Sequence, residues 1–307
     1  MAIKLCALVL LLGGATFAIE QSAINGTHVD WSKVRSIAEF DHYWTRLPAE
    51  LQVIRNALPI AASRIANGYT AVPGQFPYQV VLLSEFTLGT AFCGATVLTN
   101  SFILTTAHCV AESVGIKANG GLAIMGAYDR TIVEPEQQRI RFSTAGITIH
   151  SGYSSVNLRN DIATVLLNAP ISYTARIQPV LLPDPADQRT FAAAQGTVTG
   201  YGRTSTTGTT MSRYLRYTLN SILTNSECIA SWSSYYVEDQ NVCMSAASGR
   251  SPCIGDSGGP LLVNSAFGPL QVGIVSFGEA VGCAVNYPSI YARITYFLPW
   301  ILDNSDY

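Results

Sequence analysis

The histidines of the 307-residue chain limit where an imidazole base could lie. His28 and His42 precede the basic residue Arg64, whereas His108 and His150 follow it. His108 comes directly after an apolar, β-branched run and directly before a cysteine, a setting that would hold the ring in place. His150 has no such setting, so we predict that it is a surface or turn residue and that His108 is the candidate general base.

A hydroxyl suited to nucleophilic attack lies in the hexapeptide of residues 255–260, which reads GDSGGP. Its three glycines remove side-chain bulk around Ser257 and let a substrate carbonyl approach the backbone closely. A bare G-x-S-x-G match would be as compatible with a plain turn as with catalysis, but the full hexapeptide is more specific. We therefore predict that Ser257 is a nucleophile that a neighbouring base activates.

An acidic residue is needed to orient the imidazole and to stabilise its charged form, and Asp161 is the candidate. It opens the apolar run of residues 162–167, where an unpaired carboxylate would be costly. Taken alone, an Asp before a strand more often only caps a turn. The order His108, Asp161, Ser257 along the chain decides the matter, because it distinguishes one class of Ser-His-Asp hydrolases from the others.

Many short apolar and β-branched runs, separated by Gly, Pro, Asn and Ser clusters, follow Tyr78. This pattern is typical of all-β architecture. The proline-rich stretch 179–185 divides the runs into two sets of similar size, which predicts two β units. Residues 296–302 are expected to end the chain as a short helix. The expected strands cover residues 79–83, 95–98, 103–106, 162–167, 197–199, 261–263, 272–277 and 290–294.

The first residues of the chain have the layout of a signal peptide. Lys4 is followed by an apolar run over residues 5–12 and then by small residues up to Ala18. A membrane anchor is the alternative, but it needs roughly 20 consecutive apolar residues, more than this run provides. We expect residues 1–18 to be removed and the protein to be secreted to the extracellular space, with no membrane partner.

Residues 19–64 are expected to form an activation pro-segment, which contains no cysteine and ends at Arg64 before the hydrophobic Ile65. Its apolar residues recur every three to four positions, which suggests an amphipathic helix that Pro48 interrupts. An ordinary packed helix of the main domain is the alternative. Asn25 begins an Asn-Gly-Thr sequon and is a candidate for glycosylation. The spaced apolar residues are Val34, Ile37, Phe40, Trp44, Leu47, Leu51 and Ile54.

Cysteine number and charge restrict the function further. Six cysteines follow the leader, and an even number suits disulfides in an oxidising compartment, although sequence alone does not choose the pairs. Metal binding is the rival use, but no C-x-x-C spacing occurs, and we expect neither metal nor cofactor. With 18 basic and 20 acidic residues, the chain has no electrostatic footprint for nucleic acid.

Three short motifs, TTAHC at His108, DIA at Asp161 and GDSGGP at Ser257, resemble those of the trypsin and chymotrypsin family. The resemblance covers residues 65–301, and the chain looks most similar to dipteran midgut chymotrypsin-like proteases. It implies an all-β domain over residues 65–307, with two six-stranded antiparallel β-barrels, a crossing near 179–190, a catalytic cleft between the barrels and a short C-terminal helix.

The same resemblance implies roles for further residues. The backbone amides of Gly255 and Ser257 would form the oxyanion hole, and Ser251 would lie at the base of the specificity pocket. A serine there favours Phe, Tyr, Leu or Met over basic side chains. Gly278 and Ser289 would form the pocket walls, and Ser276, Phe277 and Gly278 would pair with the substrate backbone. The implied disulfides are Cys93–Cys109, Cys228–Cys243 and Cys253–Cys283.

Cleavage after Arg64 would free the α-amine of Ile65 to pair with Asp256, so the chain would be a zymogen. The implied partners are protein and peptide substrates, a trypsin-like activating protease and protein protease inhibitors, and we expect a monomer. Digestion, in a gut lumen, is the favoured role. The alternatives are limited proteolysis in an extracellular cascade and a non-catalytic homologue that acts as a binding module.

Overall fold

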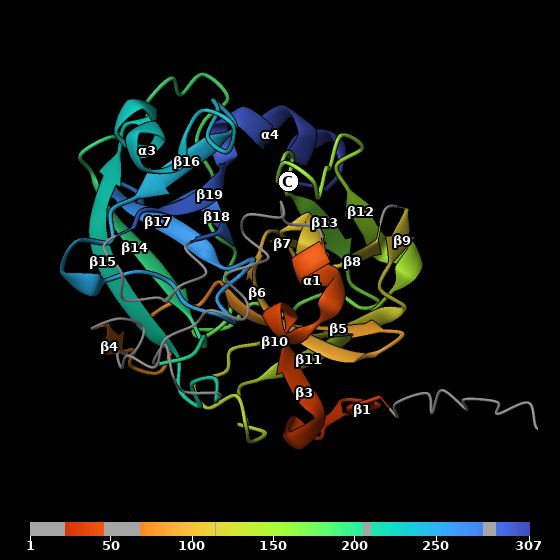
Figure 1. The fold of residues 1–307 in the computed structure, drawn as a ribbon. Helices are drawn as coiled ribbons and strands as arrows, with labels where there is room; N and C mark the ends of the chain where they lie inside the picture. The colour runs from red at the N-terminus through yellow and green to blue at the C-terminus, as the bar shows by residue number, and fades with distance from the viewer. Residues whose placement is uncertain (1–21, 46–67, 114, 205–209, 279–286) are drawn as a thin grey trace, which may run out of the picture.

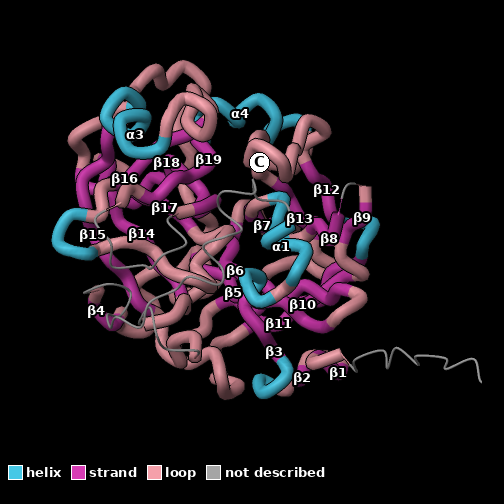
Figure 2. The backbone as a smooth tube through the Cα atoms, in the orientation of Figure 1, coloured by secondary structure: helices cyan, strands magenta, loops and turns pink. Residues whose placement is uncertain are grey.

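The computed structural model describes residues 22–45, 68–113, 115–204, 210–278 and 287–307. Two antiparallel β-barrels lie side by side, with few helices around them (Figures 1 and 2). The expected all-β class with a C-terminal helix is confirmed. Short paired segments outside the barrels are β1 (Ile24–Asn25) with β2 (His28–Val29), and β8 (Ala111–Ser113) with β9 (Ile116–Lys117).

The first barrel runs in the order β11, β10, β5, β6, β7, β13, β12. A short additional strand from the N-terminal part of the chain, β3, pairs with β6. The bounds are β3 Val34–Ser36, β5 Gln79–Phe86, β6 Gly89–Val97, β7 Phe102–Thr105, β10 Gly120–Met125, β11 Gln138–Ser143, β12 Ile147–Ile149 and β13 Ala163–Leu166.

The second barrel is a closed ring of six strands, because β14 pairs with both β17 and β15. Around the ring the order is β14, β17, β18, β19, β16, β15, and the short β4 extends it beside β15. The bounds are β4 Tyr69–Thr70, β14 Gln195–Gly200, β15 Arg216–Leu223, β16 Asn241–Met244, β17 Pro260–Ser265, β18 Gly268–Phe277 and β19 Ser289–Arg293.

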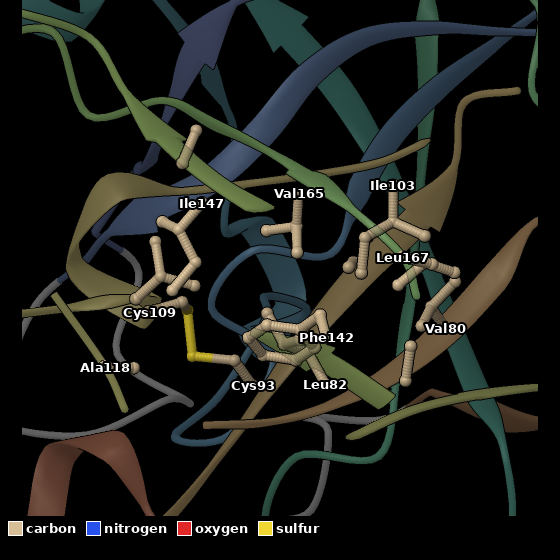
Figure 3. Packing of buried hydrophobic residues seen from close by; sticks show 14 of the residues in the cluster. Val80, Leu82, Cys93, Ile103, Cys109, Ala118, Phe142, Ile147, Val165 and Leu167 are labelled. Atoms are coloured by element: carbon tan, nitrogen blue, oxygen red, sulfur yellow. A yellow bond between two sulfur atoms is a disulfide. The ribbon is translucent and has the colours of Figure 1, made fainter. Parts of the chain in front are cut away.

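Strand β5 is apolar on both faces because it serves two different cores. Val80 and Leu82 pack inside the first barrel with Phe142 and the Cys93–Cys109 disulfide (Figure 3). Val81 and Leu83 point to the opposite face, as successive strand residues do, and join a second cluster outside the barrel. That outer cluster includes residues from the N-terminal segment, so the segment is part of a hydrophobic core.

Two helices pack on the barrels. Helix α3, Asn225–Trp232, begins with a reciprocal capping box between Thr224 and Glu227. Helix α4, Ile294–Asp303, follows β19 and packs its apolar residues against both barrels, in one cluster with Leu104 of β7 and Ile274 of β18. It lies where a C-terminal helix was expected.

The N-terminal segment, Ser22–Thr45, differs from the continuous helix that its apolar spacing suggests. After the 3-10 turn Trp31–Lys33 come β3, the 3-10 turn Ile37–Glu39 and the short helix α1, Asp41–Thr45. The helical prediction is therefore wrong before Asp41, because pairing with β6 replaces the helical hydrogen bonds. The apolar residues of the pattern up to Trp44 are nevertheless buried. Residues 47–54 lie outside the described residues.

Candidate active site

His108 is held rigidly at the end of β7. It lies in the 3-10 turn Ala107–Cys109, and the disulfide Cys93–Cys109 joins the next residue to β6. Its side chain is 1% exposed. The imidazole therefore has little freedom to change orientation, as its position beside a cysteine predicts.

Asp161 accepts hydrogen bonds from two other parts of the chain. Its Oδ2 lies 2.7 Å from Nδ1 of His108, and its Oδ1 accepts from the backbone N–H of His108 at 3.0 Å. The hydroxyl of Ser276, at the end of β18, donates to Oδ2 at 2.6 Å. An ionised carboxylate only accepts, so Nδ1 carries the proton in this arrangement and Nε2 is the basic nitrogen.

Ser257 lies in the loop that leads into β17, and glycines bring this loop against the first barrel. Its carbonyl accepts from the N–H of Gly94 in β6 at 2.7 Å. Gly258 has a φ of +80°, and a Cβ there would lie 2.3 Å from the carbonyl oxygen of Gly94 and 2.4 Å from Oγ1 of Thr105. Only glycine fits so close an approach between two backbones.

Contacts through two neighbouring residues link Ser257 to the His108–Asp161 pair. On one side, its partner Gly94 follows Cys93, which is bonded to the cysteine beside His108. On the other side, the N–H of Gly258 donates to the carbonyl of Val275 at 2.8 Å, directly before the serine that binds Asp161. The Ser257 loop of the second barrel thus contacts the part of the first barrel that holds His108.

Asp256 is a buried carboxylate whose partners among the described residues are backbone N–H groups. The N–H of Gly202 donates to Oδ1 at 2.7 Å and that of Cys253 donates to Oδ2 at 2.8 Å. Gly200 and Gly202 provide the space, since a Cβ on either would collide with the carboxylate. Burial raises the pKa of Asp256 to about 6 despite the two hydrogen bonds, and no cation of the described residues offsets it.

Comparison with known proteins agrees with this geometry. The family model "Trypsin" matches residues 65–301. The chain belongs to the trypsin family. It is 35% identical over 240 residues to brachyurin of Leptuca pugilator, covering 77% of this chain and 96% of the relative. It is 32% identical over 244 residues to a chymotrypsin of Phaedon cochleariae, covering 79% of this chain and 83% of the relative.

A solved structure of HL collagenase is similar in fold. The TM-score is 0.68 at 29% sequence identity, and the match covers 78% of this chain and 98% of that chain. The fold and the activity class are therefore established together, and this trypsin-family chain is a serine protease.

The residues expected around the specificity pocket of this trypsin-family domain lie in several elements. Ser289 begins β19, and its Oγ lies 2.8 Å from Oη of the fully buried Tyr291. Phe277 ends β18 beside β19, and its ring packs at 90° to the ring of Trp232. Ser251, which precedes Asp256 in the chain, is also buried. Gly278 is exposed, and a Cβ there would meet no atom of the described residues within 4 Å.

The remaining expected residues have mixed outcomes. The disulfides Cys93–Cys109 and Cys228–Cys243 are present. Cys253 is also disulfide-bonded, but its expected partner Cys283 lies outside the described residues, as do Arg64 and Ile65. Asn25 is exposed at the end of β1, where it pairs with His28 of β2.

His150 takes no part in the site. Its ring packs against Phe297 and Trp300 of α4, and its Nδ1 accepts from the N–H of Gly152 at 3.0 Å. Burial lowers the pKa of this imidazole. His150 begins a turn, since its carbonyl accepts from the N–H of Tyr153 at 2.9 Å, in agreement with the prediction of a surface or turn residue.

One group of potential metal ligands occurs among the described residues. Cys93, His108 and Cys109 place ligand atoms within 4.8 Å of one another. The two cysteines are joined in a disulfide, however, and a disulfide sulfur is not the thiolate that binds metals. Every described helix falls short of the length and apolar character needed to cross a membrane.

The structure adds residues that the sequence did not indicate. Ser276 was expected to act through its backbone, yet its side chain binds Asp161. Tyr43 lies with its ring centroid 5.6 Å from that of His108, and Trp44 packs in one cluster with Phe277. The aromatic pair was visible in the sequence, but no local pattern connects it with a histidine 65 residues later.

Proposed function

We propose that the protein is a secreted serine endopeptidase, made as a zymogen, that cleaves after Phe, Tyr, Leu or Met and serves digestion. The observation that carries the catalytic part is the buried His108–Asp161 pair beside the Ser257 loop. The relatives named chymotrypsin and brachyurin support the choice of class.

The reaction follows from the tautomer of His108. Ser257 Oγ attacks the carbonyl carbon of the scissile peptide while Nε2 of His108 takes the hydroxyl proton. The backbone amides of Gly255 and Ser257 donate to the oxyanion, an interaction worth roughly 3 kcal/mol for each donor. His108 then protonates the leaving amine, and water repeats the sequence on the acyl-enzyme. Asp161 holds the ring and stabilises its cationic form throughout.

Substrate preference depends on the pocket. Ser251 at its base provides no carboxylate for an Arg or Lys side chain, and burying an unpaired cation is unfavourable. The side chain of Ser289, which contacts the hydroxyl of Tyr291, would reduce the depth of the pocket. A shallower pocket favours Leu and Met over Trp. The backbone of Ser276 to Gly278 would pair with the substrate as an added strand.

Zymogen activation would supply the missing cation of Asp256. Cleavage after Arg64 frees the α-amine of Ile65, and a salt bridge with this buried carboxylate would order the neighbouring oxyanion loop. A free α-amine titrates at about 7.7 to 8.0, and pairing raises that value. Activity should therefore fall on the alkaline side, where the amine loses its proton.

Covalent labelling tests the catalytic proposal directly. The chain is cleaved with limiting trypsin and treated with an organophosphate, and the labelled residue is identified by mass spectrometry. Ser257 should be labelled, and a Ser257→Ala variant should retain about one part in 10⁶ of the wild-type kcat. A cleaved chain that takes no label at any dilution would favour the non-catalytic homologue instead.

Substrate profiling tests the specificity and the role. A peptide library varied at the residue before the scissile bond should show preference for Phe, Tyr, Leu and Met, and strong cleavage after Arg or Lys would contradict the pocket assignment. Broad hydrolysis of denatured dietary proteins supports digestion, whereas restriction to one or two sites supports the cascade alternative. Collagen belongs in the panel because a similar structure carries the name collagenase.

A further inference from the structure

The N-terminal segment binds the first barrel along a surface that ends at the candidate active site. Strand β3 pairs in parallel with β6, with Val34 opposite Thr90 and Ser36 opposite Phe92. In Figure 1 the segment climbs the face of this barrel from β3 to α1. The next residue of β6 is Cys93, which is bonded to the cysteine beside His108.

Apolar burial holds the segment on this surface. Ile37 and Phe40, 0% and 2% exposed, belong to the core cluster of the first barrel, and the Phe40 ring meets the edge of Phe86. Each fully buried side chain of this size contributes about 1.5 to 3 kcal/mol. Val34 joins the outer cluster with Leu83. These contacts would hold the segment without a covalent bond.

Polar contacts continue the surface on both sides. The carboxylate of Glu39 binds the guanidinium of Arg203, which follows β14 of the second barrel, at 2.8 Å. The guanidinium of Arg130 lies over the ring of Trp31 at 4.7 Å. The segment therefore contacts both barrels. Its binding site combines apolar contacts with an ion pair and a cation–π contact.

The end of the segment occupies the site itself. The Tyr43 ring lies edge-on to the His108 ring, and Trp44 is buried in the cluster of Phe277, Trp232 and Ile290. Phe277 belongs to the stretch proposed to pair with the substrate backbone. A substrate side chain and Trp44 cannot fill this space together.

The backbone conformation of these residues differs from that of a substrate. Tyr43 and Trp44 lie in the helix α1. In the proposed substrate complex, the peptide pairs with Ser276 to Gly278 as an added strand, which requires an extended backbone. The segment therefore does not present an extended peptide bond to Ser257, and it can remain uncut.

We infer that residues 22–45 are a built-in inhibitor whose binding surface is formed by Thr90 to Phe92 of β6 and by the surroundings of His108 and Phe277. Because the sequence between residues 19 and 64 contains no cysteine, no disulfide retains this inhibitor after cleavage at Arg64. It stays bound by contacts alone, so the activating cut yields an inhibited complex, and dissociation of the segment gives the active enzyme. This inference rests on the proposed function of the same site.

Binding is tested without catalysis. The full-length Ser257→Ala chain is cut with limiting trypsin, the ends are read by mass spectrometry, and the product is run on a native gel-filtration column at micromolar concentration. The fragment containing residues 22–45 should elute with the protease domain. In a chain with both Tyr43→Ala and Trp44→Ala, the ratio of co-eluting to free fragment should fall at least tenfold. In a chain with His28→Ala, a change at an exposed residue, this ratio should not change.

Inhibition is tested with the active chain. After cleavage, specific activity on a small Phe-containing substrate should rise at least tenfold on dilution, because the fragment dissociates by mass action. Adding a synthetic peptide of residues 22–45 should reverse the rise, and the same peptide with alanine at positions 43 and 44 should not.

The two tests separate the possible failures. A fragment that leaves the domain at once, or an activity that neither dilution nor the peptide changes, overturns the inhibitor. If Ser257 takes no organophosphate at any dilution, the proposed function fails, and inhibition fails with it, whatever the elution profile.

Discussion

The carboxylate of Asp161 connects the two barrels at the level of single hydrogen bonds. It accepts hydrogen bonds from the backbone and ring N–H groups of His108 in the first barrel and from the hydroxyl of Ser276 in the second. The orientation of the base therefore depends on both halves of the domain. Hydrogen bonds to a charged group contribute about 1.5 to 3 kcal/mol each, so each donor is expected to matter.

The change Ser276→Ala removes one of these donors without altering the strand. We expect kcat to fall by about ten- to hundredfold with little change in KM, because the lost bond positions Asp161 and does not touch the substrate. Steady-state kinetics on the activated chain measure this split. Ser143→Ala, an exposed serine of β11, is the matched control. A rise in KM at constant kcat would show that Ser276 acts in substrate binding alone.

Asp256 should make the uncleaved chain less stable as the pH rises. Its pKa is raised from 3.8 to about 6 by burial, so between these values the folded chain binds more protons than the unfolded chain. The free energy of unfolding therefore falls as the pH rises, by about 2 kcal/mol between pH 4 and pH 7. Urea unfolding of wild type and Asp256→Asn across this range isolates the effect. Parallel pH profiles would contradict it.

The site residues differ in how far the sequence could reveal them. His108 and Ser257 lie in short motifs, and Asp161 follows from the chain order, so all three can be predicted from the sequence. The side-chain bond of Ser276 joins residues 115 positions apart, and only the packing of the barrels creates it.

At the scale of elements, the junction between the β6 strand and the Ser257 loop depends on glycine. Gly94 and Gly258 place two backbones in contact, and a Cβ on Gly94 would lie 2.9 Å from the backbone nitrogen of Gly259. The small residues of the hexapeptide therefore join two barrels as well as leaving room for a substrate.

The change Gly258→Ala should separate these backbones. Its Cβ would overlap the Gly94 carbonyl, and alanine also disfavours the φ of +80°. We expect a loss of roughly 1 to 3 kcal/mol in unfolding free energy and a fall of more than a hundredfold in kcat. Gly115→Ala is the control, since its φ is +76° and no atom lies within 4 Å. Equal losses in the two variants would assign the effect to backbone strain alone.

The expected strands were largely found, because alternating and apolar runs carry a local signal. Residues 79–83 lie within β5, and residues 261–263 lie within β17. The helical prediction for the N-terminal segment is wrong, since apolar positions every three to four residues can also be buried by a strand between two 3-10 turns. The partner of that strand, Thr90 to Phe92 of β6, is more than 50 residues away, and no local sequence pattern indicates it.

At the scale of the whole molecule, the described residues form two barrels and an N-terminal segment that contacts both. The segment packs into the hydrophobic core of the first barrel, and its Glu39 binds Arg203 beside the second. It therefore contributes to stability as well as covering the site. Cleavage at Arg64 would convert this intramolecular packing into an association between two chains.

This conversion should make the melting temperature depend on concentration. A ligand that binds only the folded state adds about 1.4 kcal/mol of stability for each tenfold rise in concentration above its Kd. For a domain of this size that corresponds to about 3 to 6 °C. The uncleaved Ser257→Ala chain should show one Tm at all concentrations, since its segment cannot leave. Calorimetry of the cleaved and uncleaved forms over a hundredfold concentration range measures the difference, and a constant Tm for the cleaved form would mean that the segment does not stabilise the barrels.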